Sequence, residues 1–195
     1  MHAGTDMGMG MTTERVAPPL PALPSPGPAG RLRDMNRLLA LLAAVAILTA
    51  PALAAEWGHY VNERFGVEAD VPPGFEPGAE PANGDGLRFS TPTADLAIYG
   101  SFLVADDFEA EARQQITFAE AEGWGITYQA VTPGWAVWSG RKGSRILYAR
   151  AVPICSGGGI GAFQLTYMQA DLKRFDPVVE RLGRSLRDSG TGWQC

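Results

Sequence analysis

The turns that separate the apolar segments in the second half of this sequence are too short for parallel strand pairing. Only short, glycine-containing stretches lie between four segments rich in β-branched and aromatic residues. A parallel crossover needs a dozen or more residues, so these neighbouring segments must run antiparallel. The four expected strands are residues 126–132, 135–139, 145–154 and 162–168.

Four more strands are expected before them. The first two form a hairpin around a turn at residues 63–66, and residues 76–86, almost all turn formers and acids, form a surface loop. The strands are residues 59–62, 67–71, 87–90 and 96–104. Alternation in the last strand places Leu96, Ile98, Phe102 and Val104 on one face, and Tyr99 and Ser101 on the other.

Two amphipathic helices complete the pattern. The first begins with a pair that resembles a capping box, Asp106 and Glu109, and ends at Gly123. The second has Asp176 as its N-cap, Pro177 at its first position and Gly190 after its end. The predicted buried stripes are Phe108, Ala112 and Ile116 in the first helix, and Val178, Val179, Leu182 and Leu186 in the second.

The element order is therefore ββββ-α-ββββ-α, an α+β fold in which two helices pack as a second layer on an antiparallel sheet. This order resembles the Mog1/PsbP-like α/β/α sandwich group. The resemblance also rests on the opening Tyr60-Val61-Asn62-x-Arg64-Phe65-Gly66-Val67, followed by Val71-Pro72 and Phe75. A similar opening, leading to a loop like Asn83-Gly84-Asp85-Gly86, is found in small exported bacterial proteins of unassigned function.

The resemblance implies the sandwich fold and an accessory or binding role. The group includes photosystem accessory proteins and a small-GTPase-binding protein. None of their functional residues can be matched to a position in this sequence, so the resemblance implies no catalytic residue and no cofactor here.

Residues 35–54 have the three regions of a secretory signal peptide in order. Arg37 supplies the positive charge, an apolar run follows, and Ala-Leu-Ala precedes a predicted cleavage point after Ala54. An uncleaved membrane anchor is the alternative, because residues 38–55 carry no charge, but Pro51 and the small-x-small site favour cleavage. Residues 1–34 are expected to be a disordered leader or the product of a misassigned start. The predicted mature protein, residues 55–195, is a single α+β domain that is periplasmic or secreted.

The composition argues against a nucleic-acid partner. The sequence has 16 Lys and Arg against 21 Asp and Glu, a net charge of −5, whereas phosphate binding needs a concentrated positive patch. Both cysteines, Cys155 and Cys195, lie in the predicted exported part, where the redox environment favours a disulfide. An intramolecular bond is expected, with two free thiols or intermolecular pairing as the alternatives.

No combination of residues in this sequence specifies a reaction, so we predict no catalytic residue, no metal and no cofactor. His59 is the only histidine after the predicted cleavage point, and we interpret it as a strand-surface residue. The glycine-rich residues 156–161 lack the lysine and the following helix of a phosphate loop, which favours a hairpin loop. Asn83 and Asp85 lie in a stretch that lacks the alternating acids of a calcium loop, which favours a tight turn, and both are candidate ligand or partner contacts. A weak cation contact at the acidic residues Glu76, Glu80 and Asp85 is a remaining alternative.

Two tryptophans, Trp135 and Trp138, flank the basic turn residues Arg141 and Lys142. Packing of these rings under the helices or across strands is the favoured interpretation, and a ligand or protein contact lined by aromatic and basic residues is the alternative. Our leading hypothesis is an exported module that binds an envelope protein or small ligand, without stable membrane insertion after cleavage. The alternative is an enzyme, such as a carboxylate-dependent hydrolase, and a close pair of buried carboxylates in a cleft would favour it.

Overall fold

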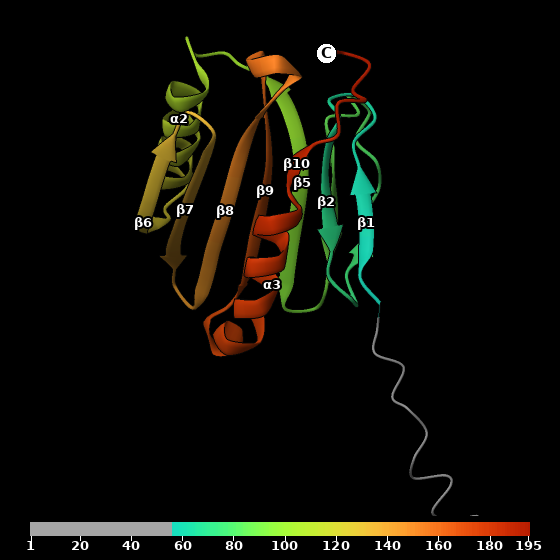
Figure 1. The fold of residues 1–195 in the computed structure, drawn as a ribbon. Coiled ribbons are helices and arrows are strands. Elements are labelled where there is room, and N and C mark those ends of the chain that lie inside the picture. Colours follow the sequence, from blue (N-terminus) through green and yellow to red (C-terminus); the bar gives the residue numbers. More distant parts are fainter. Residues whose placement is uncertain (1–55) are drawn as a thin grey trace, which may run out of the picture. The chain divides into compact units, whose positions relative to one another are not determined.

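The computed structural model describes residues 56–195 (Figure 1). The predicted leader and signal peptide fall outside these residues. The described chain forms a seven-stranded sheet with the order β3-β4-β5-β9-β8-β7-β6 and a three-stranded sheet with the order β1-β2-β10. All strand pairs are antiparallel, as the short turns predicted.

The structure confirms an antiparallel α+β fold and adds two strands of two residues each. The large sheet contains β3 (Glu76–Pro77), β4 (Gly86–Ser90), β5 (Ala94–Phe102), β6 (Gly125–Thr132), β7 (Trp135–Lys142), β8 (Arg145–Ile154) and β9 (Gly159–Met168). The small sheet contains β1 (Gly58–Val61), β2 (Val67–Val71) and β10 (Arg187–Asp188). The helices are α2 (Phe108–Ala121) and α3 (Leu172–Ser185), with single 3₁₀ turns at Cys155–Gly157 and Gln169–Asp171. The two-residue strands β3 and β10 were not predicted.

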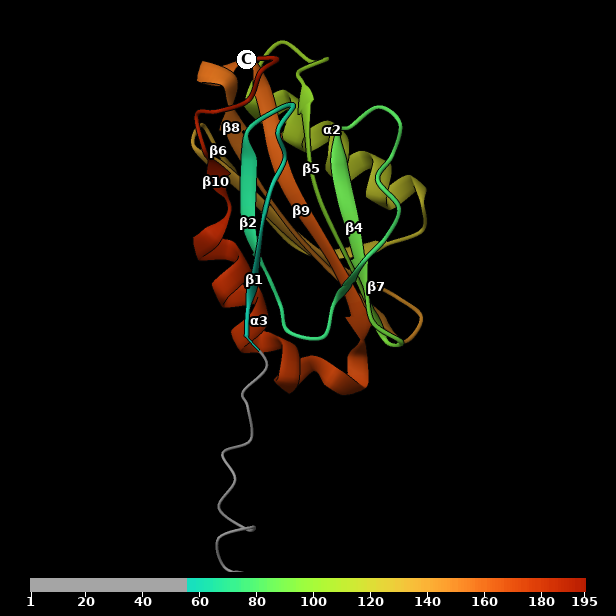
Figure 2. The same cartoon turned by 90° about the vertical axis from the view of Figure 1, so that its right-hand side faces the viewer.

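The two helices pack on opposite faces of the large sheet (Figures 1 and 2). This corrects the single helical layer inferred from the helix pattern and agrees with the α/β/α sandwich that the resemblance implies. Side chains of β9 alternate between two cores: Phe163 and Leu165 pack with α3, whereas Ile160 and Ala162 pack with α2. The small sheet packs on the same face of the large sheet as α3. The centre of the large sheet is therefore buried on both sides, and the fold has three layers.

A pair of glycines lets the small sheet lie close to the large one. Gly100 of β5 and Gly161 of β9 are directly opposite each other in the register. A Cβ atom on Gly100 would lie 2.5 Å from Cβ of Phe65, and one on Gly161 would lie 2.7 Å from a methyl carbon of Val67. The turn and strand that carry Phe65 and Val67 thus pack directly onto bare backbone.

Strand β5 ends two residues before the predicted strand 96–104, so the predicted place of Val104 in the strand is wrong, whereas Phe102 lies on the predicted face and contacts Phe65 edge to face with ring centroids 5.2 Å apart. Phe102 is 44% exposed and Val104 is 85% exposed. Pairing stops because β9 begins at Gly159, opposite Phe102. Beyond that point, the buried carboxylate of Glu111 accepts hydrogen bonds from the backbone N–H groups of Val104 and Ala105, at 2.9 and 3.0 Å. This contact holds the segment in a loop.

Helix α2 has the predicted buried stripe but a different cap. The carboxylate of Asp107, not of Asp106, accepts a hydrogen bond from the N–H of Ala110 at 2.7 Å. Adjacent acids allow either residue to cap a helix, and Asp107 is the one with extended backbone angles at the helix start.

Helix α3 begins at Leu172, so the predicted N-cap at Asp176 is wrong and Pro177 lies inside the helix. The earlier start places Phe175 in the core, where it is 2% exposed and stacks on Tyr167 with ring centroids 4.4 Å apart. The helix also ends before the predicted Gly190, because Leu186 is extended and leads into β10. Neither helix of residues 56–195 is long and apolar enough to cross a membrane.

Candidate binding pocket

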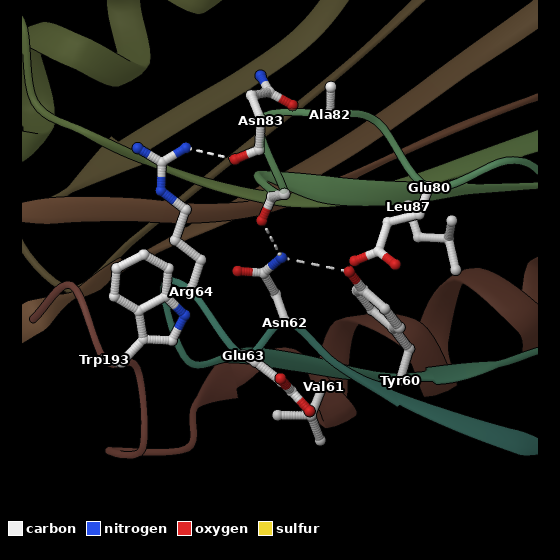
Figure 3. Close-up of a pocket in the computed structure, with 11 residues that line it drawn as sticks. Tyr60, Val61, Asn62, Glu63, Arg64, Glu80, Ala82, Asn83, Leu87 and Trp193 are labelled. Carbon is white, nitrogen blue, oxygen red and sulfur yellow. Dashed lines mark hydrogen bonds between the residues drawn. The ribbon is translucent and has the colours of Figure 1, made fainter.

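A pocket of about 540 Å³ lies where the β1–β2 turn, the loop before β4 and the C-terminal tail meet (Figure 3). We call it the Trp193 pocket. The side chains that matter to its chemistry are Tyr60, Asn62, Glu63, Arg64, Glu80 and Trp193. The pocket therefore combines two segments near the start of the described chain, residues 60–64 and 80–87, with Trp193 from its end.

Asn62 is the side chain that holds the pocket's two loops together. It is 3% exposed, and its amide N–H₂ donates to the carbonyl of Gly84 at 2.9 Å and to the hydroxyl of Tyr60 at 3.2 Å. Its amide oxygen accepts from the N–H of Phe65 at 2.8 Å. Both ends of the amide are thus engaged, and Asn62 has a structural role.

Arg64 forms a second link between the same loops. Its guanidinium donates to the carbonyl of Asn83 at 2.5 Å and lies over the Phe65 ring, 4.8 Å from the centroid. Its Nε is buried and has no hydrogen-bond partner within residues 56–195. The guanidinium is therefore fixed in place with donor capacity left over.

The hydroxyl of Tyr60 is a hydrogen-bond donor in this pocket. Burial raises the pKa of Tyr60, and the nearby carboxylates of Glu80, Asp85 and Glu63 raise it further, against the hydrogen bond from Asn62, which lowers it. A phenol with an ordinary pKa near 10 is neutral at physiological pH, and an upward shift keeps it so. Because Asn62 donates to the phenol oxygen, the Tyr60 proton remains available to a ligand.

The C-terminal tail closes the pocket and presents Trp193. The N–H groups of Trp193 and Gln194 donate to the carbonyls of Glu63 and Arg64, at 3.2 and 3.0 Å. The tail can approach because Gly66, at φ +72°, faces Gly192: a Cβ atom on Gly66 would lie 2.7 Å from the Gly192 nitrogen. The backbone of the tail is thereby pinned, yet the Trp193 ring is 67% exposed.

The predicted pair of cysteines forms a disulfide in the structure. Cys155 and Cys195 are 40 residues apart in sequence, and their Cα atoms are 4.8 Å apart. The N–H of Cys155 also donates to the carboxylate of Asp188 at 3.0 Å. These contacts anchor the end of the chain that carries Trp193.

Asn83 and Asp85, predicted as ligand or partner contacts, lie in the loop beside the pocket. The N–H of Gly84 donates to the carbonyl of Pro81 at 2.9 Å, and Gly84 has φ +62°, so this stretch is the predicted tight turn. The Asn83 amide donates to the Asp85 carboxylate at 2.7 Å. Asn83 lines the Trp193 pocket, whereas Asp85 lines the neighbouring pocket.

The other predicted contact residues are not brought together. Trp138 is 2% exposed and packs in the α2-side core, whereas Trp135 stacks with Arg150, whose guanidinium carbon lies 5.5 Å from the Trp135 ring centroid. Strand alternation explains the separation, because residues 135 and 138 of one strand point to opposite faces. Arg141 is exposed, and Lys142 donates to the carbonyl of Glu122 at 2.6 Å. They form no shared site with the tryptophans.

His59 is a strand-surface residue, as interpreted from the sequence, but it has acidic neighbours that the sequence did not place. Its ring nitrogens lie 3.2 Å from an oxygen of Asp70 and 3.3 Å from one of Glu68. Asp70 is its direct cross-strand partner. The glycine-rich residues 156–161 complete the 3₁₀ turn and begin β9, so they form the connection of an antiparallel hairpin.

The buried carboxylates of residues 56–195 do not form a close pair. Glu68 is 9% exposed on β2 and contacts Arg187 and His59. Glu111 is 6% exposed on α2 and caps the Val104–Ala105 backbone. The two lie on opposite sides of the large sheet, so the arrangement that would favour a carboxylate-dependent hydrolase is not formed by them.

Sequence reasoning did not select Tyr60, Asn62, Arg64 or Trp193 as site residues. Three of the four lie in the opening segment that carried the family resemblance. That resemblance was a sequence feature that pointed to this end of the fold. Trp193 carried no comparable signal, because only the disulfide and the tail's backbone contacts bring it to the pocket.

No protein-family model matches the chain, and no curated protein matches its sequence. Solved structures do match its fold. The solution structure of cyanobacterial PsbP (CyanoP) from Synechocystis has a TM-score of 0.54 at 14% identity, over 71% of this chain and 96% of that chain. The Saccharomyces cerevisiae Ran-binding protein Mog1p has a TM-score of 0.51 at 5% identity, over 70% of this chain and 97% of that chain. With two helices on opposite faces of an antiparallel sheet, the chain has the fold of the Mog1/PsbP-like group.

Proposed function

We propose that this protein is an exported accessory module that binds a protein partner of the cell envelope through the Trp193 pocket. The observation that carries the proposal is the grouping of Tyr60, Arg64 and the exposed Trp193 around one open pocket. Trp, Tyr and Arg are the residues most enriched among those that dominate binding energy at protein interfaces. Their backbones are held by hydrogen bonds, which lowers the entropy lost on binding.

The pocket favours a partner segment that combines an apolar side chain with a positive charge. Trp193 and the exposed Val61 supply apolar surface, whereas Glu63 and Glu80 are exposed carboxylates at the rim. Contacts with the Asn83 carbonyl and the Phe65 ring hold the Arg64 guanidinium in place, so its charge offsets only part of this acidic rim. A lysine or arginine of the partner would therefore meet one of these carboxylates while its neighbour packs on Trp193.

Two features support export. The order of charge, apolar run and small-x-small site at residues 35–54 is that of a cleavable signal peptide. The Cys155–Cys195 disulfide suits an oxidising compartment and is rare in a reducing one. One fold relative, Mog1p, is a Ran-binding protein, which is consistent with a binding role for this fold but gives no partner here.

Comparative affinity capture tests the partner site. The tagged wild-type protein, the Trp193→Ala variant and the Tyr128→Ala variant are each incubated with native envelope extract, and retained proteins are quantified by mass spectrometry. Tyr128 is a matched control, because it is 56% exposed on β6, outside the pocket lining. We expect a partner that wild type and Tyr128→Ala retain equally and that Trp193→Ala loses at least tenfold. A retained set unchanged by Trp193→Ala would contradict the proposal.

N-terminal sequencing of protein from the native host tests export independently. We expect the mature chain to begin at Ala55. A chain that starts at Met1 or Met35 on membrane-bound material would favour the anchor instead.

A further inference from the structure

Strand β6 is a long, unshielded edge of the large sheet. It is the last strand in the sheet order and has 8 residues (Figure 1). Proteins usually shield such edges with charges, proline or very short strands, because unpaired backbone groups bind other strands. The opposite edge follows this rule, since β3 consists only of Glu76 and Pro77. By contrast, β6 reads Gly-Ile-Thr-Tyr-Gln-Ala-Val-Thr, with no charged residue and no proline.

The helices leave this edge uncovered. The core residues beneath α2 come from β7, β8 and β9, and on the other face α3 packs on β8 and β9. Thr127, Tyr128 and Gln129 are exposed. Within residues 56–195, no backbone hydrogen bond from a turn or loop reaches Gln129 or Val131. The edge is therefore free to pair with another strand.

The hairpin geometry identifies which backbone groups face outward. A two-residue turn joins β6 to β7, so the pair that closes the turn, Thr132 with Trp135, is a hydrogen-bonded pair. Bonded and non-bonded pairs alternate along an antiparallel ladder. Ala130 thus directs its N–H and C=O to β7, whereas Gln129 and Val131 direct theirs to the open edge.

One antiparallel register pairs this edge with itself. A β-bulge near the start of β6 and the turn after it leave residues 128–132 as the regular part of the strand. A two-fold axis at Ala130 places Gln129 opposite Val131 of a second copy, and the reverse. Both residues direct their backbone groups outward, so each pair can exchange N–H and C=O hydrogen bonds. The regular edge is therefore complementary to a second copy along its whole length.

Side chains and charges suit the same register. The Tyr128 ring, which is 56% exposed, lies opposite Thr132 of the second copy, and aromatic and β-branched pairs stabilise sheets. The small Ala130 lies on the axis. Arg141 and Lys142 end β7 beside the start of β6. Antiparallel pairing keeps these basic residues of the two copies at opposite ends of the interface, so like charges do not meet.

We infer that the protein forms a homodimer in which β6 pairs antiparallel with β6 of a second copy, which joins the two large sheets into one. Backbone hydrogen bonds supply most of the affinity in this mode of strand addition. The regular edge is shorter than the roughly 20 to 30 residues a side of a standard interface, so the dimer is weak and concentration-dependent. The inference does not rest on the proposed partner site, because no residue of β6 lines the Trp193 pocket.

Analytical ultracentrifugation of the purified protein, at about 1 to 500 μM, tests the inference. We expect the wild type to pass from monomer to dimer over this range. Ala130→Lys and Ala130→Glu should each weaken the dimer about tenfold or more, because each places like charges opposite each other on the axis. An equimolar mixture of the two variants should restore the dimer, since opposite charges then meet. Thr93→Lys, at an exposed turn, and Trp193→Ala should dimerise like the wild type.

Three results would overturn the inference. One is a wild type that stays monomeric up to about 500 μM, which would leave the edge to a strand of a different protein. The others are unchanged dimerisation of both Ala130 variants, and a mixture that dimerises no more tightly than either variant alone.

A second variant covers the case in which the charged variants do not fold. Ala130 is partly buried, so urea denaturation checks the fold of both. If they are unfolded, Gln129→Pro decides the matter, because the Gln129 side chain is exposed and its N–H faces outward. Proline there removes an interface donor and leaves the pairing with β7 in place. We expect a folded monomer, and a Gln129→Pro dimer as tight as the wild type would contradict the inference.

Discussion

One continuous helix, α2, covers one face of the large sheet, whereas the other face is covered by segments from both ends of the described chain. The β1–β2 hairpin comes from the beginning, and α3 with β10 comes from the end. The first cover forms from neighbouring residues, since α2 lies between β5 and β6. The second requires closure over more than a hundred residues, for example from Asp70 to Arg181, 2.7 Å apart.

The side chains of the two cores also differ in size. The α2-side core contains many alanines, which allow a helix to pack closely on a sheet: Ala112, Ala119, Ala136, Ala149, Ala151 and Ala162. The other core is filled by large aromatic residues: Phe75, Phe89, Phe163, Tyr167 and Phe175. A tightly packed alanine face is expected to be sensitive to added volume, and an aromatic core to removed volume.

The largest expected effect is truncation in the aromatic core. Phe175→Ala should lower the free energy of unfolding by about 3 to 5 kcal/mol, because Phe175 is 2% exposed and its loss leaves a cavity against Tyr167. Phe118→Ala, at an exposed phenylalanine of α2, is the control and should change it by less than about 1 kcal/mol. Urea denaturation measures both. Equal effects would show that the aromatic core does not depend on this ring.

Removing the covalent link should weaken the closure of the same face. The Cys155→Ala, Cys195→Ala double variant should lose about 2 to 4 kcal/mol, because a cross-link that spans 40 residues restricts the unfolded chain. Reductant should destabilise the wild type by a similar amount and leave the double variant unchanged. Intact-mass measurement of the wild type after alkylation without reductant verifies the bond. Two alkylated thiols in that measurement would show that Cys155 and Cys195 are not joined and would contradict this prediction.

Added volume should instead damage the α2 side. Ala149 is fully buried in the alanine-rich core, so Ala149→Leu should cost about 1 to 3 kcal/mol through overpacking. Ala79→Leu, in the exposed loop before β4, is the control and should be close to neutral. An unchanged urea midpoint in Ala149→Leu would mean that α2 can move outward without loss, and the contrast between the two cores would fail.

The smallest expected effect concerns charge. Burial alone would raise the pKa of Asp70, but hydrogen bonds from Arg181 and His59 outweigh it and hold the pKa below its ordinary value. A lowered folded-state pKa stabilises the fold above the unfolded value of about 4, and this stabilisation is lost as the pH falls through the folded pKa. Asp70→Asn should therefore cost about 1 kcal/mol at pH 7 and progressively less below about pH 4.

Urea denaturation from pH 7 to pH 3 measures this difference. Glu120→Gln, at an exposed position of α2, serves as the control and should show no such convergence with the wild type. If the gap between wild type and Asp70→Asn stays constant down to pH 3, the Asp70 ion pair does not link the hairpin to α3.

The local sequence pattern was sufficient to predict the antiparallel sheet. Strands β2 and β8 match the expected residues 67–71 and 145–154, and the stripe of Phe108, Ala112 and Ile116 on α2 is buried as expected. These features depend on side-chain alternation and on turn length, which act over a few residues. The hairpin between β1 and β2 was predictable for the same reason.

Helix limits and the site needed longer-range information. Asp176 and Pro177 form a plausible helix start, yet the burial of Phe175 against Tyr167 favours five earlier helical residues. Asn62 reads as an ordinary strand end, and nothing in its neighbours predicts that its amide reaches Gly84. Trp135 and Trp138 are close in sequence but lie on opposite faces of β7.

The sequence by itself determined the antiparallel pairing, the order of the eight longer strands and the two helices, and the pair of cysteines available for a bond. The tertiary structure alone decided which sheet face each helix covers, where Phe102 and Val104 become exposed, and how Trp193 reaches the pocket. The physical reason is that periodicity shows that a surface is apolar but not which segment covers it. That choice depends on packing between residues far apart in the chain, such as Gly66 against Gly192.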